Sequence, residues 1–204
     1  MRNKLIGAAL TALLFAGSIT AQTSQDTLTP SVEKSVKGIQ IGESGLVLNY
    51  EIRLADQFTL RTEAGYTLAF SFGDDNPVFS EDKNSSVIAV PTFTVEPRWY
   101  YNLNRRIRKG KDITRNRANY FSLFANYCGG WGAINLSNNI DEVPDFIIVS
   151  PMWGMRRTLG QHFNYELGAG VGYSYVGEYK HFTHYHKSDE TVALIVRARF
   201  GFDL

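Results

Sequence analysis

Cysteine, proline and long apolar runs are all scarce in this chain of 204 residues. Cys128 is the single cysteine, which excludes an intramolecular disulfide. After Ala21, no window holds the run of about twenty apolar residues that a membrane-spanning helix needs. Six prolines stand against 18 glycines and 13% aromatic residues, a composition typical of strands joined by turns. The formal net charge is only +1, so the total charge indicates no particular class of partner.

The first segment, Met1–Ala21, has the pattern of a secretory signal peptide. Arg2 and Lys4 form a positively charged start, the stretch Leu5–Ser18 is apolar and uncharged, and a small alanine precedes Gln22. The apolar stretch is too short and too rich in alanine to be a convincing spanning helix. We therefore expect an exported protein whose mature chain begins after Ala21.

The last fourteen residues alternate strictly between two kinds of side chain. A period of two places alternate residues on opposite faces of a strand. One face is apolar and ends in aromatics, whereas the other carries arginines; the apolar set is Val192, Leu194, Val196, Ala198, Phe200, Phe202 and Leu204. A soluble sheet buries its apolar face, whereas a barrel in lipid turns that face outward. Together with the signal, this pattern predicts a β-barrel of a Gram-negative outer membrane.

Six further segments show a similar alternation, so seven strands are well marked. They are Leu46–Leu54, Phe58–Phe72, Ala89–Trp99, Phe121–Trp131, Ile147–Arg156, Phe163–Tyr175 and Thr191–Leu204. A single-chain bacterial barrel closes with an even number of strands, so an eighth is needed. We assign it to Lys34–Gly42. The alternative joins Gly38–Leu54 into one long strand and recruits Glu178–Lys187, but that last segment lacks an apolar face.

The predicted fold is therefore all-β: a closed, eight-stranded antiparallel transmembrane β-barrel over residues Lys34–Leu204, preceded by a short polar segment, Gln22–Glu33. A C-terminal strand that runs toward the periplasm fixes the side on which each connection lies. The expected periplasmic connections are Ala55–Gln57, Asn102–Asn119 and Leu159–His162, and the expected outer loops are Gly73–Ser86, Ile134–Asp145 and Gly177–Glu190. Short periplasmic turns and long outer loops are typical of such barrels.

Two segments carry a family resemblance: the hairpin Asn49–Gly65 and the terminal strand Arg197–Leu204. In these segments the chain resembles small outer-membrane β-barrels of the OmpA transmembrane-domain and opacity-protein type. The resemblance is one of pattern over nearly the whole mature chain and contains no catalytic motif. It implies an aromatic residue near the C-terminus that helps assembly; here that residue is Phe202, and the chain ends at Leu204.

Charged residues fall on the inward face near one end of the predicted strands. They are Glu51, Arg53, Arg61, Glu63, Glu96, Arg98, Arg156, Glu166, Arg197, Arg199 and Asp203. The interior of an eight-stranded barrel is just wide enough to be filled by side chains. Because a buried charge without a partner is costly, we expect a plug of salt bridges. A gated polar path is the alternative.

A strongly basic connection, Asn102–Asn119, separates two of the strands. It carries seven basic residues against the single acid Asp112: Arg105, Arg106, Arg108, Lys109, Lys111, Arg115 and Arg117. An exported barrel does not meet nucleic acid, which excludes that partner. A solvated turn, contact with anionic lipid headgroups and contact with an acidic periplasmic partner stay open. In each case we expect the turn to be dispensable for folding.

The predicted outer loops hold acids and histidines. The acids are Asp74, Asp75, Glu81, Asp82, Asp141, Glu142 and Asp145, and their spacing does not match an EF-hand. The last loop contains His181, His184, His186, Ser188 and Glu190, a set that could bind a metal or serve a lipid A-modifying hydrolase. No second strand holds an acid to orient the base, so we expect mobile polar loops with no catalytic, metal or cofactor site.

We therefore predict a non-enzymatic outer-membrane protein with a structural or surface-contact role in the cell envelope. Its expected partners are outer-membrane lipids and lipopolysaccharide. A lipid A-modifying hydrolase and a narrow diffusion channel are the alternatives.

Overall fold

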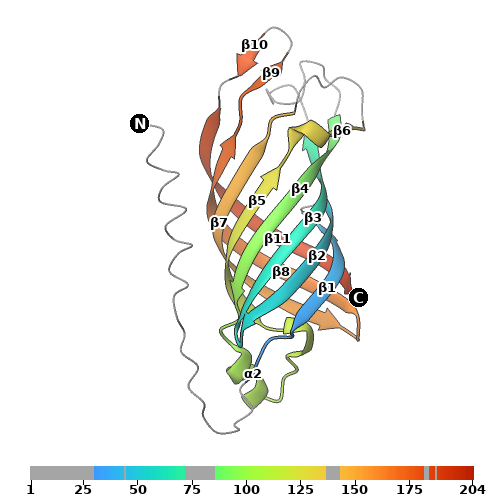
Figure 1. Ribbon diagram of the computed structural model, residues 1–204, viewed down its shortest axis with the longest axis vertical. Helices are drawn as coiled ribbons and strands as arrows, with labels where there is room; N and C mark the ends of the chain where they lie inside the picture. The colour runs from blue at the N-terminus through green and yellow to red at the C-terminus, as the bar shows by residue number, and fades with distance from the viewer. Residues whose placement is uncertain (1–29, 44, 72–85, 137–142, 182–183, 187) are drawn as a thin grey trace.

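Eight long antiparallel strands form one closed barrel (Figure 1). The computed structural model describes residues 30–43, 45–71, 86–136, 143–181, 184–186 and 188–204. In chain order the barrel strands are β1 (Ser35–Gly42), β2 (Gly45–Ala55), β3 (Phe58–Ser71), β4 (Ser86–Trp99), β5 (Asn119–Cys128), β7 (Phe146–Leu159), β8 (Phe163–Val176) and β11 (Asp189–Asp203). The all-β, eight-stranded antiparallel barrel predicted from the sequence is confirmed. The predicted signal peptide and most of the polar segment after it lie outside the described residues.

Short elements mark the two ends of the barrel, as Figure 1 shows. The helix α2 (Leu103–Arg108) and the 3-10 turn η1 (Thr114–Asn116) join β4 to β5 at one end, here called the α2 end. The opposite end, here called the hairpin end, carries η2 (Gly130–Gly132), β6 (Ile134–Asn135), β9 (Tyr179–His181) and β10 (His184–His186). In the described part of the chain, no helix has the length and apolar character that crossing a membrane requires.

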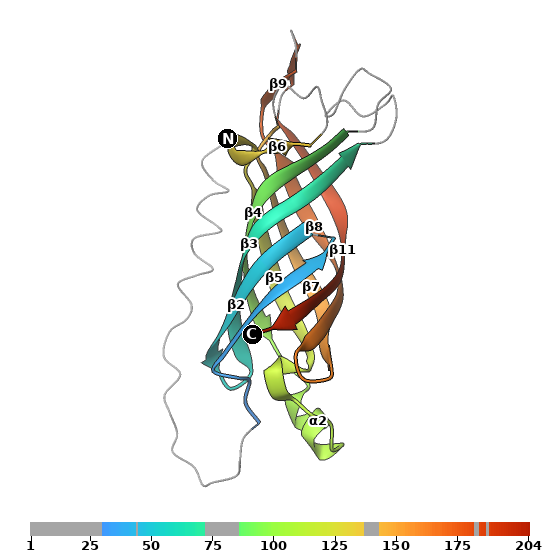
Figure 2. The ribbon, with the colours of Figure 1, turned by 90° about the vertical axis from the view of Figure 1, so that its right-hand side faces the viewer.

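The barrel closes where its first strand meets its last. Ile39 in β1 lies opposite Leu48 in β2 and opposite Phe202 in β11, and Figure 2 shows β1 beside β11. The prediction of a separate first strand is therefore confirmed, and the alternative of one long strand is wrong. The segment recruited by that alternative instead forms the two-stranded sheet of β9 and β10, apart from the barrel sheet.

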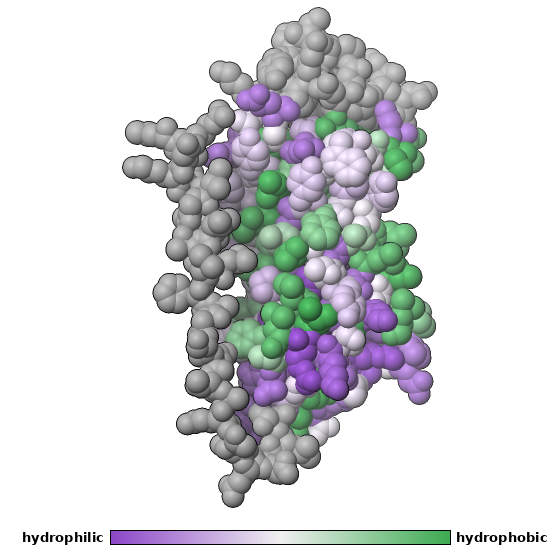
Figure 3. All heavy atoms as spheres, in the orientation of Figure 1, coloured by the Kyte–Doolittle hydropathy of each residue, from purple (hydrophilic) through white to green (hydrophobic). Residues whose placement is uncertain are grey.

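The alternation along each strand sets which side chains face the lumen. In β2, for example, buried and exposed residues alternate from Gly45 to Glu51. Apolar residues that alternate with the inward positions are solvent-accessible on the outer wall: Phe93, Val95, Phe121, Leu123, Val149, Val171, Leu194 and Val196. Figure 3 shows apolar side chains gathered on the middle of the barrel wall and hydrophilic ones near the α2 end. The barrel thus has an apolar outer wall and charged side chains buried in its lumen.

One strand is shorter than its alternation predicts. β5 ends at Cys128, and Gly130–Gly132 continue as a 3-10 turn. Trp131, which we expected on the outward face of this strand, is 81% exposed beyond the strand end. The glycines explain the difference, because they weaken a strand and permit a tight turn. The alternating sequence pattern therefore extends beyond Cys128, where β5 ends.

The register at the closing seam can be tested by a disulfide. In a Cys128→Ser background, we expect Ile39→Cys and Phe202→Cys to cross-link, because directly opposed residues of an antiparallel pair have Cα atoms about 4.5–5.5 Å apart. The measurement is the electrophoretic mobility of oxidised and reduced protein. The control pair, Ile39→Cys with Ala198→Cys, is offset along β11 and should stay reduced. Cross-linking of the control alone would contradict the register.

Candidate functional site

The part of the lumen near the α2 end is filled by charged side chains of both signs. Five arginines and five carboxylates there are each 2% exposed or less: Arg61, Arg98, Arg156, Arg197, Arg199, Glu51, Glu63, Glu96, Glu166 and Asp203. We call this set the lumen network. When all ten are ionised their charges cancel, so the network needs no buried counter-ion.

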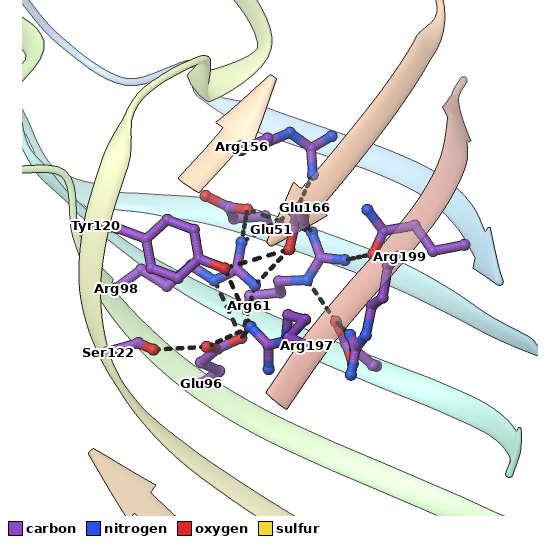
Figure 4. Close-up of polar contacts among 12 residues, drawn as sticks. Glu51, Arg61, Glu96, Arg98, Tyr120, Ser122, Arg156, Glu166, Arg197 and Arg199 are labelled. Atoms are coloured by element: carbon purple, nitrogen blue, oxygen red, sulfur yellow. Dashed lines mark hydrogen bonds and ion pairs between the residues drawn. The ribbon is translucent and has the colours of Figure 1, made fainter. Parts of the chain in front are cut away.

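Glu166 on β8 lies at the centre of the network (Figure 4). Its carboxylate accepts hydrogen bonds from Arg61 at 3.3 Å and from Arg98 at 3.1 and 3.3 Å. Arg156 forms a third ion pair with it, and the Tyr120 hydroxyl donates from 3.4 Å. Donors from β3, β4, β5 and β7 therefore converge on one carboxylate, which lets it stay ionised without water.

The other carboxylates each bridge separate strands. Glu96 on β4 accepts from Arg98 at 2.7 Å and from Arg197 on β11 at 2.8 Å. Glu63 on β3 accepts from Arg199 on β11 at 2.7 and 2.8 Å. These pairs join β11 to the opposite side of the barrel, and Figure 4 draws the contact between Glu96 and Arg197. Glu63 and Glu96 therefore each have a cation within hydrogen-bonding distance, whereas the guanidinium nitrogens nearest to Glu51 lie at 3.6 Å.

Neutral side chains extend the network to the remaining strands. Gln40 on β1 accepts from Arg61 at 2.6 Å and donates to Asn164 on β8 at 2.7 Å. Tyr120 on β5 contacts Glu166, and its ring fits because residue 154 is glycine: a Cβ there would lie 2.4 Å from the ring. All eight barrel strands therefore supply at least one side chain to a single connected set.

Arg53 is a correction to the predicted lumen set. Its guanidinium donates to Ser31 Oγ at 2.6 Å and to the carbonyl of Val32 at 3.4 Å. Among the described residues it forms no ion pair with the carboxylates of the lumen network. The cause is its place at the end of β2, where the register with β3 shifts after Arg53. The side chain therefore ties the segment before β1 to the rim of the barrel.

The α2 end of the lumen is closed by packed side chains. Val32, Tyr100, Leu103, Ala118 and Tyr120 form a buried cluster against which Ile113 packs. Leu103 belongs to α2, so this cluster anchors the short helix to the barrel. The predicted basic connection is therefore part of the core at both of its ends.

Asn116 extends the same connection into the lumen. It is fully buried, and its side-chain amide donates to Glu51 at 2.8 Å while its carbonyl oxygen accepts from the Glu33 amide at 2.8 Å. Its φ of 60° lies in the left-handed region, which asparagine tolerates better than most residues. Asn116 is therefore buried and not solvated, and its removal would leave Glu51 short of a donor. That folding does not depend on the connection stays a prediction.

Sequence reasoning missed several members of this site. Gln40, Tyr100, Tyr120 and Asn164 sit on the same inward faces as the predicted charges, so alternation could have identified them. Asn116 follows no strand pattern, because it reaches Glu51 through a 3-10 turn. No signal in the sequence indicates that contact.

The basic side chains of the connection divide into two groups. Arg117 pairs with Asp112, and Arg115 lies 3.3 Å from His162 Nδ1. Arg108 is exposed on α2. The remaining four, Arg105, Arg106, Lys109 and Lys111, line a pocket of about 190 Å³ together with Asn102 and Arg157. Four of the seven predicted basic residues therefore surround one pocket. Arg157 also lines this pocket, although the sequence did not group it with the basic connection.

The predicted histidine set lies along the β9–β10 hairpin and the start of β11. His184 pairs with His181 across the β9–β10 hairpin, where the sequence predicted no regular structure. Ser188 is exposed, and Glu190 lies in β11, where it hydrogen-bonds to Tyr173. In the described ranges no group of three or more histidines, cysteines or acids is arranged to hold a metal ion.

Most of the predicted loop acids, Asp74, Asp75, Glu81, Asp82, Asp141 and Glu142, lie outside the described residues. Asp145 is described, and it accepts hydrogen bonds from Tyr127 at 3.0 Å and from the Gly130 amide at 2.7 Å. Its role in the structure is to hold the strand end at the hairpin end of the barrel.

Comparison of the chain with protein-family models, curated proteins and solved structures finds no match.

The central carboxylate should carry much of the stability of the barrel. We expect Glu166→Gln to lower the free energy of unfolding by about 3–5 kcal/mol, because it leaves three buried guanidinium groups around a neutral amide. Urea unfolding followed by tryptophan fluorescence measures the change. Lys37→Gln, at an exposed position on β1, is the control and should change stability by no more than about 0.5 kcal/mol. Equal stability of the two variants would contradict the central role of Glu166.

Proposed function

We propose that the protein is an integral outer-membrane β-barrel that serves envelope structure or surface contacts and catalyses no reaction. The observation that carries this proposal is the inverted polarity of the barrel. Large apolar side chains such as Leu194 and Val171 are more than half exposed on the wall, whereas ten charged groups are buried inside. Water disfavours such a surface, and a bilayer favours it.

Aromatic residues at the α2 end add to this support. Trp99 stacks with Phe58 at a centroid distance of 6.2 Å and lies 6.3 Å from Phe121, and all three rings are exposed. Indole and phenol rings gather where membrane meets water. In the proposed orientation, the α2 end faces the periplasm and the hairpin end faces the cell exterior. The signal-like segment Met1–Ala21 is consistent with export to that membrane.

The filled lumen favours a structural role over a diffusion channel. All ten charged residues of the lumen network are 2% exposed or less, so water has almost no access to that section. A cavity of about 160 Å³ lies beside it, lined by residues that include Asn126, Cys128 and Arg197. This cavity reaches the network at Arg197, whose guanidinium is held by Glu96. Lipids and lipopolysaccharide are the partners that the wall would meet.

The facing of β11 provides the test of membrane insertion. Leu194 is 73% exposed on the wall, whereas its neighbour Ile195 lines the internal cavity. We expect Leu194→Arg to reduce insertion into lipid vesicles, since an arginine near the bilayer midplane costs about 2–4 kcal/mol. Ile195→Arg, the matched control, should insert better. Heat-modifiable electrophoretic mobility reports the inserted fraction, and equal insertion of both variants would refute the proposed facing.

The closed lumen provides the test against the channel. Purified wild-type protein inserted into a planar bilayer should give no steady current, because the lumen network blocks the path. Insertion in the same preparation is verified by protease resistance. Stable ohmic currents from wild-type protein would overturn the structural role and favour diffusion.

A further inference from the structure

We propose that the pocket beside α2 is a binding site for the phosphate headgroup of an anionic phospholipid in the periplasmic leaflet. The inference rests on the proposed membrane insertion and goes beyond it, because it assigns a defined lipid site to one face of the barrel. The pocket of about 190 Å³ is lined by Arg105, Arg106, Lys109, Lys111, Arg157 and Asn102.

The first argument is the excess of positive charge around the pocket. Of the ion pairs among the described residues, only Arg117 with Asp112 falls in the segment from α2 to η1. Arg106 donates to the carbonyl of Asp112 at 2.8 Å, but its buried Nε has no hydrogen-bond partner among the described residues. Five cations around one hollow repel one another unless an anion lies between them.

The electrostatics of Arg106 agree with this geometry. Burial lowers the pKa of its guanidinium, and the charge of Arg117 lowers that pKa further, although Asp112 opposes the shift. A neighbouring phosphate would add negative charge to that of Asp112, the one acid that acts on Arg106. Guanidinium groups bind phosphate oxygens in a bidentate manner, and lysines add point charges.

The second argument is the apolar surface that adjoins the pocket. Arg157 donates to Asn119 Oδ1, and Asn119 Nδ2 donates to the Tyr101 hydroxyl at 3.4 Å. The same hydroxyl accepts from Trp153 Nε1 at 2.9 Å. One chain of hydrogen bonds therefore runs from the basic pocket to an exposed aromatic residue on the outer wall.

The strand positions place that aromatic surface above the pocket. Trp153 and Arg157 belong to β7 with an even separation, so they share the outward face of the strand. Trp153 lies opposite Phe121 of the neighbouring strand β5, and Leu123 is the next residue on the outward face of β5. Acyl chains that lie along these side chains would bring a headgroup phosphate to Arg157 and α2.

This arrangement fits a lipid better than a soluble anion or an acidic protein. A soluble anion needs the cations alone, whereas here the cations lie at the foot of an apolar and aromatic surface. The inner leaflet of an outer membrane consists of phospholipids, so a ligand with both a charged phosphate and apolar acyl chains is present at that depth. We therefore name the occupant as a phosphodiester lipid with a net negative charge.

The test measures lipid binding by the purified full chain in micelles of a zwitterionic detergent. Phosphatidylglycerol and phosphatidylcholine are titrated separately, and lipid retained on the barrel is measured by native mass spectrometry. We expect wild-type protein to retain phosphatidylglycerol in preference to phosphatidylcholine. The triple variant Arg105→Gln, Lys109→Gln and Lys111→Gln should bind phosphatidylglycerol more weakly, by about fivefold for each charge removed.

A charge-matched variant separates a defined site from general attraction. Lys34→Gln, Lys37→Gln and Arg108→Gln remove three exposed positive charges near the same end of the barrel but outside the pocket. This control variant should retain most of the phosphatidylglycerol binding of the wild-type protein. The single substitution Arg157→Gln should weaken that binding. Equal weakening by the two triple variants would overturn the site.

Two further outcomes would also refute the lipid assignment. Displacement of phosphatidylglycerol by inorganic phosphate at equal concentration would indicate a site for soluble anions. Binding of an acidic peptide to the pocket with no preference between the two lipids would indicate a protein partner. Heat-modifiable mobility is recorded for each variant, so that loss of lipid binding by an inserted barrel is distinguished from failure of insertion itself.

Discussion

The constraint on which this structure depends is charge neutrality inside a narrow barrel. An eight-stranded barrel has no room for a water-filled core, so every inward side chain must find its partners within the protein. Five arginines and five carboxylates balance one another's charge there, with Glu166 accepting from three of the arginines. Because most of the pairs cross between strands, the network also fixes how the strands lie relative to one another.

The outer surface follows from the same alternation. Once arginines and carboxylates occupy the inward positions of a strand, the residues between them face outward, and here these are mainly leucine, valine and aromatic residues. Under the proposed membrane insertion, a bilayer is the solvent of this wall. One alternating pattern therefore encodes both the charged interior and the apolar outer wall of the barrel. The α2 end adds a third environment, where exposed cations lie beside aromatic rings.

Alternation made most of the fold predictable, because period two is a local property of the chain. It correctly assigned the faces of the strands and the separate first strand, Ser35–Gly42. It did not reveal α2 or the burial of Asn116, since both depend on contacts with residues distant in sequence. Arg53 shows the limit of the method: its position has inward parity, but the strand end carries it to the rim, where it bonds to Ser31. The grouping of Arg157 with α2 was equally invisible, because β7 and α2 meet only in three dimensions.

The contribution of β11 to the network has a consequence for the order of assembly. Glu96 and Glu63 each pair with an arginine of their own strand and with one of β11, the last barrel strand in the chain: Arg197 and Arg199, respectively. A sheet of the first seven barrel strands would hold those carboxylates without these two partners, so its concave face would have to stay hydrated. Arrival of the final strand supplies the missing positive charges and completes the ring in one event. Drying of the interior and closure of the seam are therefore coupled, which makes the last step of folding cooperative.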